Sequence, residues 1–443
     1  MTSLMQISKV TVPTSIYDAV VAPDPPFGND PAEPAGDDPL GGWPLIGDLT
    51  RLLRSPAVSR QAAEQLAVAV AADGGGEPQC APADRIAFSE LAGVAQLAAE
   101  AATGLPITPD RRAVDVSVVN RSGWAQHTLR DWRPLFGQLA EGLTATREET
   151  DPASSPETPE ALLRRMMEPL APLLADMTAG SLTGHLARVA LASHDVALPR
   201  VRSDRLLLVE PNISAFARAW NLPRDDTCLW VCVHSLVCNA VLGVASVRGR
   251  MTDLLAQFAG GFEMNPEKIA ESLQEKLADF DAGEAMGEMP ALLGHPEMLL
   301  GATRSERQEA LAEDLADFVA VLGGFVDATT DRACAQLLGS ASPVREAFRR
   351  RRLSPPGEAR RLARFLGVDA GPEASARGAR FVQGVTERAG ADGLGRLWHA
   401  AENWPTPNEV DAPGLWLARL EVYESPEGRG GREGPGDRPD SGR

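Results

Sequence analysis

The chain has 443 residues, enough for one large domain or two ordinary ones, and 44% of them are hydrophobic, a share typical of folded proteins. With 61 acidic and 43 basic residues the net charge is -18, and such a field repels phosphate backbones, so nucleic acid is not an expected partner. The five cysteines form no CxxC pair, which indicates a reducing compartment rather than a disulfide framework. The first 20 residues lack the apolar core and cleavage site of a signal peptide. We therefore expect a cytoplasmic protein.

The two ends of the chain are rich in Pro, Gly and charged residues, as in residues 22–43. Such segments cannot bury enough apolar surface to fold. We therefore predict a mainly α-helical domain between two disordered tails. The predicted boundaries are 1–45 for the first tail, 46–423 for the domain (a helical part at 46–145 and a core at 161–423) and 424–443 for the second tail.

The periodicity between the tails is largely helical. Small residues at 179, 180 and 184 would let one helix approach another closely. The one clear strand candidate is Arg205–Val209, which precedes a Glu-Pro-Asn turn signal. The predicted helices cover 56–71, 84–102, 161–193 and 304–338, with shorter ones within 374–401, and the predicted linker and loop cover 146–160 and 279–301.

Residues 227–247 form the one uncharged run of membrane length. A spanning helix needs about 20 mostly apolar residues, so length alone permits one. However, His234, Ser235 and Asn239 lie near its centre, where unpaired polar groups are costly in lipid. We interpret the run as a buried core helix and predict no integral membrane segment.

The same run contains a partial metal motif. In H-E-x-x-H, two histidines one helical turn apart bind zinc, and the glutamate acts as general base on the zinc-bound water. Here the window reads His234-Ser235-Leu236-Val237-Cys238. A cysteine thiolate can bind zinc, whereas a serine hydroxyl cannot act as the base at neutral pH. On the residues alone, a hydrogen-bonded core histidine beside a small buried thiol is the favoured explanation.

Three longer segments, 115–124, 206–243 and 365–420, resemble the actinobacterial zincin-like metallopeptidases in the order of their motifs. That order is V-x-R-x-x-W, P-N-x-x-A-F, L-W-x-x-x-H-E-x-x-H, L-E-G-x-x-D, and a closing P-T-x-x-E-x-x-x-P-x-x-W-x-x-R. The resemblance covers roughly residues 90–422, and it implies a zincin-like metallopeptidase fold.

The resemblance also implies that the metal site is degenerate. His234 matches the first zinc ligand, Ser235 stands in place of the base, and Cys238 stands in place of the second histidine. Gly323 replaces the glutamate of the downstream motif, whose aspartate is Asp327. His234 and Cys238 remain as candidate metal ligands, and a rebuilt His234/Cys238/Asp327 set is an alternative. Asp331 is expected to be solvated or paired near Arg332, and His295 to lie in an exposed loop.

Two further features are interpreted as structural. The arginine-rich stretch 345–365 reads as a solvated helix end and loop rather than as a docking site for an acidic partner or a membrane. The remaining histidines show no recognisable pairing, namely His127, His185, His194 and His399. The sequence thus predicts a pseudo-metallopeptidase that binds a peptide or protein, with no cofactor. The alternative is an active zinc hydrolase with a rebuilt His/Cys site.

Overall fold

The fold is built around one buried helix, α9 (Arg224–Gly243), in a computed structural model. The structure describes residues 56–73, 75–138, 171–196, 198–200, 204–260, 306–338 and 343–424. All of these residues belong to one compact unit that spans Thr50–Arg443. The predicted division of 46–423 into two parts therefore stays a prediction.

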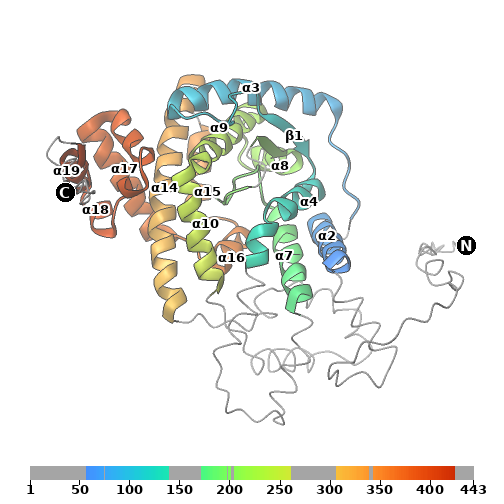
Figure 1. The fold of residues 1–443 in the computed structure, drawn as a ribbon. Helices are drawn as coiled ribbons and strands as arrows, with labels where there is room; N and C mark the ends of the chain where they lie inside the picture. The colour runs from blue at the N-terminus through green and yellow to red at the C-terminus, as the bar shows by residue number, and fades with distance from the viewer. Residues whose placement is uncertain are drawn as a thin grey trace, which may run out of the picture. The chain divides into compact units, whose positions relative to one another are not determined.

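The helices that surround α9 come from distant parts of the chain. Helix α3 (Pro82–Thr103) and helix α14 (Glu306–Leu338) both pack on α9, and Figure 1 shows α3 crossing over α9. The other elements are α2 (Pro56–Ala72), α4 (Arg121–Asp131), α7 (Ala171–Ala187), α8 (Glu210–Ala219), α10 (Ala245–Gly260), α15 (Pro343–Leu353), α16 (Gly357–Phe365), α17 (Gly371–Leu394), η3 (Gly395–Trp398), η4 (Ala401–Asn403), α18 (Pro407–Asp411) and α19 (Pro413–Glu424).

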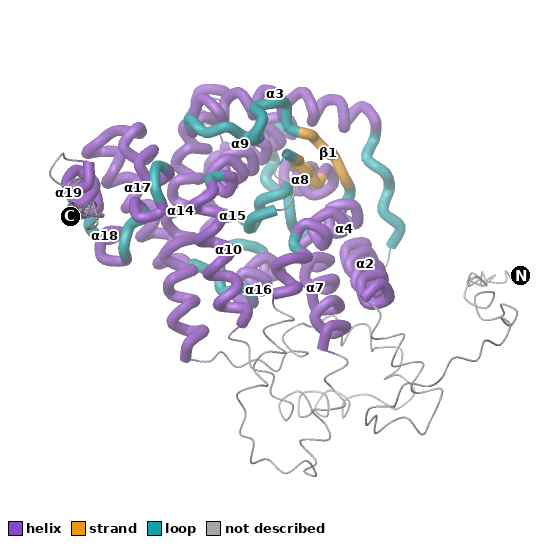
Figure 2. The backbone as a smooth tube through the Cα atoms, viewed as in Figure 1, coloured by secondary structure: helices purple, strands orange, loops and turns teal. Residues whose placement is uncertain are grey.

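Two strands form a small parallel sheet, visible in Figure 2. Strand β1 (Asp115–Val119) pairs with β2 (Arg205–Val209), so that Asp115 lies opposite Arg205. The prediction of β2 is confirmed, and so is the mainly helical fold with a small strand element. Strand β1 was missed, because its five residues carry little pattern of their own and their partner lies far away in the sequence.

Most predicted helices are confirmed, with two corrections. The helix expected over 161–193 ends at Ala187, after which Ala192 forms an isolated bridge with Leu208. The shorter helices expected within 374–401 begin earlier, at Gly371, because α17 starts there; a kink at Gly390 (φ +71°) interrupts α17, and η3 follows it. Residues 1–45, 146–160, 279–301 and 425–443 lie outside the described residues.

Glycines allow two helix pairs to touch backbone to backbone. A Cβ atom on Gly180 of α7 would collide with the carbonyl oxygen of Ala63 in α2. Likewise, a Cβ atom on Gly378 of α17 would overlap the backbone of Ala320 in α14. The close approach predicted from the small residues of α7 is therefore confirmed.

The residues of the V-x-R-x-x-W and P-N-x-x-A-F motifs, from segments 115–124 and 206–243, are joined by hydrogen bonds. Arg121 Nε donates to Asn212 Oδ1 at 2.8 Å, and the Asn212 amide donates to the carbonyls of Ala187 and Ala190. The Trp124 indole N–H donates to the carbonyl of Ala192 at 3.0 Å. These bonds join α4 and α8 to the segment that follows α7, so both motifs stabilise the fold.

The closing motif also holds structure together. Arg419 of α19 pairs with Glu409 at 2.6 Å, and Glu409 accepts from the backbone N–H of Thr406 in a capping box. The buried Trp416 donates from its indole to the carbonyl of Asn403 at 2.6 Å. The motif therefore ties η4, α18 and α19 to one another.

Candidate functional site

Helix α9 is enclosed from Thr227 to Leu242 except at one residue. From Thr227 to Leu242, every side chain is buried apart from His234, which keeps 27% of its exposure. By length and apolarity, α9 could cross a membrane, but 83% of its most apolar window is buried within the fold. Within this stretch, His234 is therefore the one point at which a molecule outside the fold could reach α9.

An acidic and a basic side chain from two other helices meet at His234. Asp327 of α14 places Oδ1 3.8 Å from His234 Nε2, which is too long for a hydrogen bond. Its other oxygen, Oδ2, accepts from Arg352 Nε of α15 at 2.8 Å. Helices α9 and α14 thus bring His234 and Asp327 together, as the rebuilt metal set requires. The guanidinium of Arg352, however, holds the aspartate.

Arg351, the neighbour of Arg352, also points into the fold. Its guanidinium donates to Asp195 at 2.7 Å and to the carbonyl of Val189 at 2.8 Å. Only 17% of the Arg351 side chain and 28% of the Arg352 side chain is exposed. The interpretation of 345–365 as a solvated end is wrong for these two residues. It holds for Arg349 and Arg350, which pair with Glu346 on the exposed face of α15.

Asp331 lies one turn beyond Asp327 on α14. It was expected to be solvated or paired near Arg332, but its partner comes from another helix. It pairs with Arg345 at 3.1 Å, whereas Arg332 donates to the carbonyl of Ala102. His295 lies outside the described residues. Helix α15 therefore supplies an arginine to each of the two aspartates.

Burial and these arginines shift the pKa values of the central groups. Burial lowers the pKa of His234 to about 4, with Arg352 and Arg351 acting in the same direction. Burial raises the pKa of Asp327 to about 7 and outweighs the opposing effect of Arg352. Both side chains keep some exposure, yet protein atoms crowd around them. At neutral pH the imidazole is uncharged, and the carboxyl is close to its titration point.

The other two positions of the motif face the interior. Ser235 Oγ lies 3.3 Å from Nδ1 of His194, and these residues are only 1% and 3% exposed. A Ser–His contact so enclosed gives no substrate access to the hydroxyl. Cys238 is 1% exposed, and burial raises the pKa of its thiol to about 12. The thiol is therefore protonated at neutral pH, and the thiolate is the form that binds zinc.

These residues do not fit a zinc ion. A structural or catalytic site needs at least three protein ligands in tetrahedral geometry. No group of three His, Cys, Asp or Glu side chains with that capacity occurs in the described part of the chain. Gly323, one turn before Asp327, contributes no side chain at all. Thus His234 and Asp327 come close together, but the donor set stays incomplete.

A model of the zincin-like metallopeptidase family matches residues 58–417. The chain belongs to this family. The matched range includes α9, α14 and α15, and it begins about 30 residues before the range that the motifs indicated. The predicted family and fold are confirmed, while the actinobacterial origin and the degenerate state of the metal site stay predictions.

A solved structure has a related fold. It is a protein from Chloroflexus aurantiacus, described as a candidate hydrolase with a novel fold, with a TM-score of 0.50 and 17% sequence identity. The similarity covers 82% of this chain and 98% of that one. At such low identity the likeness concerns the fold alone. No curated protein matches the chain.

Sequence reasoning missed His194, Arg351 and Arg352. His194 lies in the short segment between α7 and β2, and no motif or spacing marks it. The prediction that His194 lacks a partner is wrong, because its Nδ1 lies 3.3 Å from Ser235 Oγ. Burial lowers the pKa of His194 well below its usual value, and the charges of Arg200 and His234 act in the same direction. His127 also has a partner, Arg205, at 3.1 Å.

Proposed function

We propose that this protein is a non-catalytic member of the zincin-like metallopeptidase family, which binds a peptide or protein partner at the opening beside His234. The observation that carries the proposal is the Asp327–Arg352 ion pair placed against His234. A guanidinium is permanently charged and covalently attached. The guanidinium of Arg352 therefore neutralises the charge of Asp327. This pair lies in the region where the family motifs would supply the metal ligands.

The chemistry of the remaining residues supports this proposal. Peptide hydrolysis by a zinc enzyme needs a metal-bound water and a base to deprotonate it. Ser235 offers no base, Cys238 is a neutral buried thiol, and Gly323 offers no ligand. Three of the four functional side chains expected from the motifs are therefore replaced by groups without the required chemistry.

In this proposal, binding draws on two polar atoms that are buried close to the Asp327–Arg352 pair and that a partner reaches only by displacing the side chains that cover them. Arg352 Nη1 and Asp331 Oδ1 are buried atoms with no hydrogen-bond partner among the described residues. Burying a donor or acceptor without a partner costs about 1–3 kcal/mol. A peptide carbonyl or N–H group that reached these atoms would relieve that cost. We place this role in the cytoplasm, consistent with the cysteine usage.

The deciding test measures metal and activity in the full chain, purified without a histidine tag and without chelators. We expect less than about 0.1 zinc per chain, by analogy with sites that lack three ligands. Casein cleavage should equal that of His234→Ala, both with and without added zinc. About one zinc per chain, together with cleavage that His234→Ala abolishes, would overturn the proposal.

The second candidate is an active zinc hydrolase with a rebuilt site. One observation favours it: His234 Nε2 lies 3.8 Å from Asp327 Oδ1, and Cys238 follows His234 by one turn on α9. If Arg352 moved away, these three could become ligands. Zinc bound at one equivalent in the wild type and lost in Cys238→Ala would support this candidate.

A further inference from the structure

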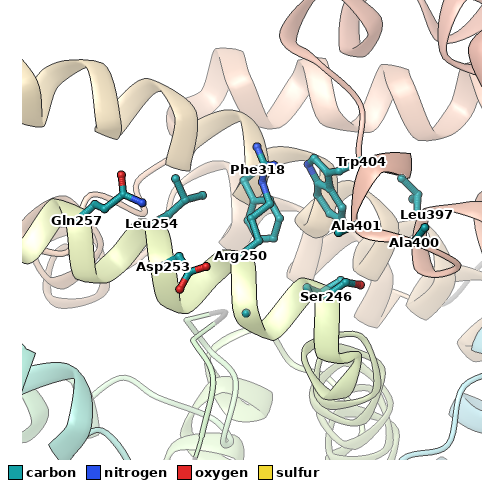
Figure 3. A pocket seen from close by; sticks show the side chains of 12 residues that line it. Ser246, Arg250, Asp253, Leu254, Gln257, Phe318, Leu397, Ala400, Ala401 and Trp404 are labelled. Carbon is teal, nitrogen blue, oxygen red and sulfur yellow. The ribbon is translucent and has the colours of Figure 1, made fainter. Parts of the chain in front are cut away.

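A groove separate from the His234 site lies between α10 and the C-terminal segment. It has a volume of about 490 Å³, within the usual range for ligand sites. Figure 3 shows Arg250 reaching from α10 toward Phe318, with Trp404 on the far side. The lining residues are Ser246, Val247, Gly249, Arg250, Asp253, Leu254, Gln257, Phe318, Leu397, Ala400, Ala401 and Trp404, and none of them belongs to the His234 site.

The floor of the groove is apolar and aromatic. The rings of Phe318 and Trp404 lie 4.3 Å apart between their centroids, and both residues are almost fully buried beneath the surface. Leu254, also buried, extends the floor along α10. The exposed edges of these three side chains are therefore the apolar surface that the groove offers to a group that enters it.

Arg250 provides a positive charge at this floor. Its guanidinium lies 5.7 Å from the centre of the Phe318 ring, a distance at which the ring face attracts a cation. Arg250 is exposed and forms no ion pair with any residue that the structure describes. Its charge therefore remains available to an anion that enters the groove.

Polar residues follow one face of α10 beside this charge. Ser246, Arg250, Asp253 and Gln257 recur at spacings of three or four residues and all line the groove. This polar row extends about 16 Å at the rise of an α-helix. From Arg250 to Gln257 the row extends about 10 Å, which an extended peptide covers with about three residues.

We propose that this groove binds the C-terminus of a peptide or protein whose last residue is large and apolar. The terminal carboxylate pairs with Arg250, and the last side chain lies on Phe318, Trp404 and Leu254. The preceding peptide groups run along Asp253 and Gln257, because the negative charge of Asp253 disfavours a carboxylate at that end. A fatty acid has the same carboxylate but no groups for the polar row, so the row favours a peptide.

The test uses the full chain and a fluorescein-labelled pentapeptide, Gly-Ser-Ala-Ala-Leu, with either a free carboxylate or a C-terminal amide. Fluorescence polarisation should show saturable binding of the acid and at least ~10-fold weaker binding of the amide, as expected for loss of a charge-assisted hydrogen bond. Arg250→Gln should weaken the acid by a similar factor. The matched control Arg85→Gln, which removes an exposed arginine from α3, should bind within twofold of the wild type.

A second variant leaves Arg250 in place. Ala401 is exposed and lines the groove, so Ala401→Glu adds volume and a repelling charge without disturbing the core. It should also weaken binding at least ~10-fold. The proposal is overturned if no saturable binding occurs, if acid and amide bind equally, or if Arg250→Gln binds like the wild type. Dodecanoate binding more tightly than the peptide would assign the groove to a fatty acid instead. None of these outcomes depends on the zinc content of the protein. The zinc measurement tests only the proposed function at His234, so the two proposals can fail separately.

Discussion

Replacing Arg352 by Met should destabilise the protein by an amount that depends strongly on pH. The substitution keeps most of the side-chain volume but removes the cation 2.8 Å from Asp327. At that distance the Coulomb attraction is about 6 kcal/mol for an effective dielectric constant of 20. Because 28% and 32% of the two side chains is exposed, water screens the pair. We expect a net loss of about 1–3 kcal/mol at pH 8.

The loss should be much smaller at pH 5. The pKa of Asp327 is raised from 3.8 to about 7 in the folded protein, so the folded state binds this proton more tightly than the unfolded state does. The resulting contribution to the stability of the fold is fully present below about pH 4 and is lost as the pH rises through 7. Without Arg352 this pKa rises further, and the added cost appears only where the carboxyl is ionised. Arg352 also lowers the pKa of His234, so its removal slightly favours the folded state in acid.

Urea unfolding, followed by tryptophan fluorescence at pH 5 and pH 8, measures this difference. The matched control is Arg349→Met, which removes an exposed arginine of the same helix and should leave the pH dependence unchanged. An equal loss of stability at both pH values, or the same pH dependence in both variants, would refute the reasoning that Asp327 and Arg352 form a screened, titrating pair.

Three further predictions concern the metal ligands and the packing. The double variant Cys238→His/Gly323→Glu should bind about one zinc per chain by atomic absorption, since a Cβ atom at Gly323 meets nothing within 4 Å; binding no stronger than in either single variant would contradict this. Arg200→Met should lower the free energy of unfolding in urea by about 3–5 kcal/mol. The Arg200 side chain is only 1% exposed, and its removal leaves the carboxylate of Asp131 without its cation; a loss under 1 kcal/mol would contradict this prediction. Gly378→Ala should cost about 1–3 kcal/mol by forcing α14 and α17 apart, whereas Gly323→Ala should be neutral or stabilising.

The sequence predicts the parts of the structure that depend on local pattern. The apolar run of α9, with a hydrogen-bonded Asn239 that donates to the carbonyl of Ile107, could only be a core helix or a membrane span. The Glu-Pro-Asn signal after Val209 marked the end of β2, although these residues begin helix α8 and do not form a turn. The family resemblance made Asp327 a neighbour of His234 only on the condition that the two helices pack face to face, and in the structure the two side chains lie 3.8 Å apart.

The sequence could not show how α15 docks. Four consecutive arginines, 349–352, differ only in their angle around the helix, which changes by 100° per residue. Only tertiary packing decides that Arg351 and Arg352 face inward while Arg349 faces solvent. His194 was missed for a similar reason, because a non-helical segment of irregular shape brings it to Ser235.

The Asp327–Arg352 pair has a consequence for how the protein responds to its surroundings. A bound ion stabilises a folded protein by an amount that depends on its free concentration and dissociation constant. Arg352 is part of the same chain, so its effective concentration at Asp327 is set by the fold and cannot be diluted. While the protein is folded, Arg352 therefore balances the charge of Asp327 without a contribution from a free cation.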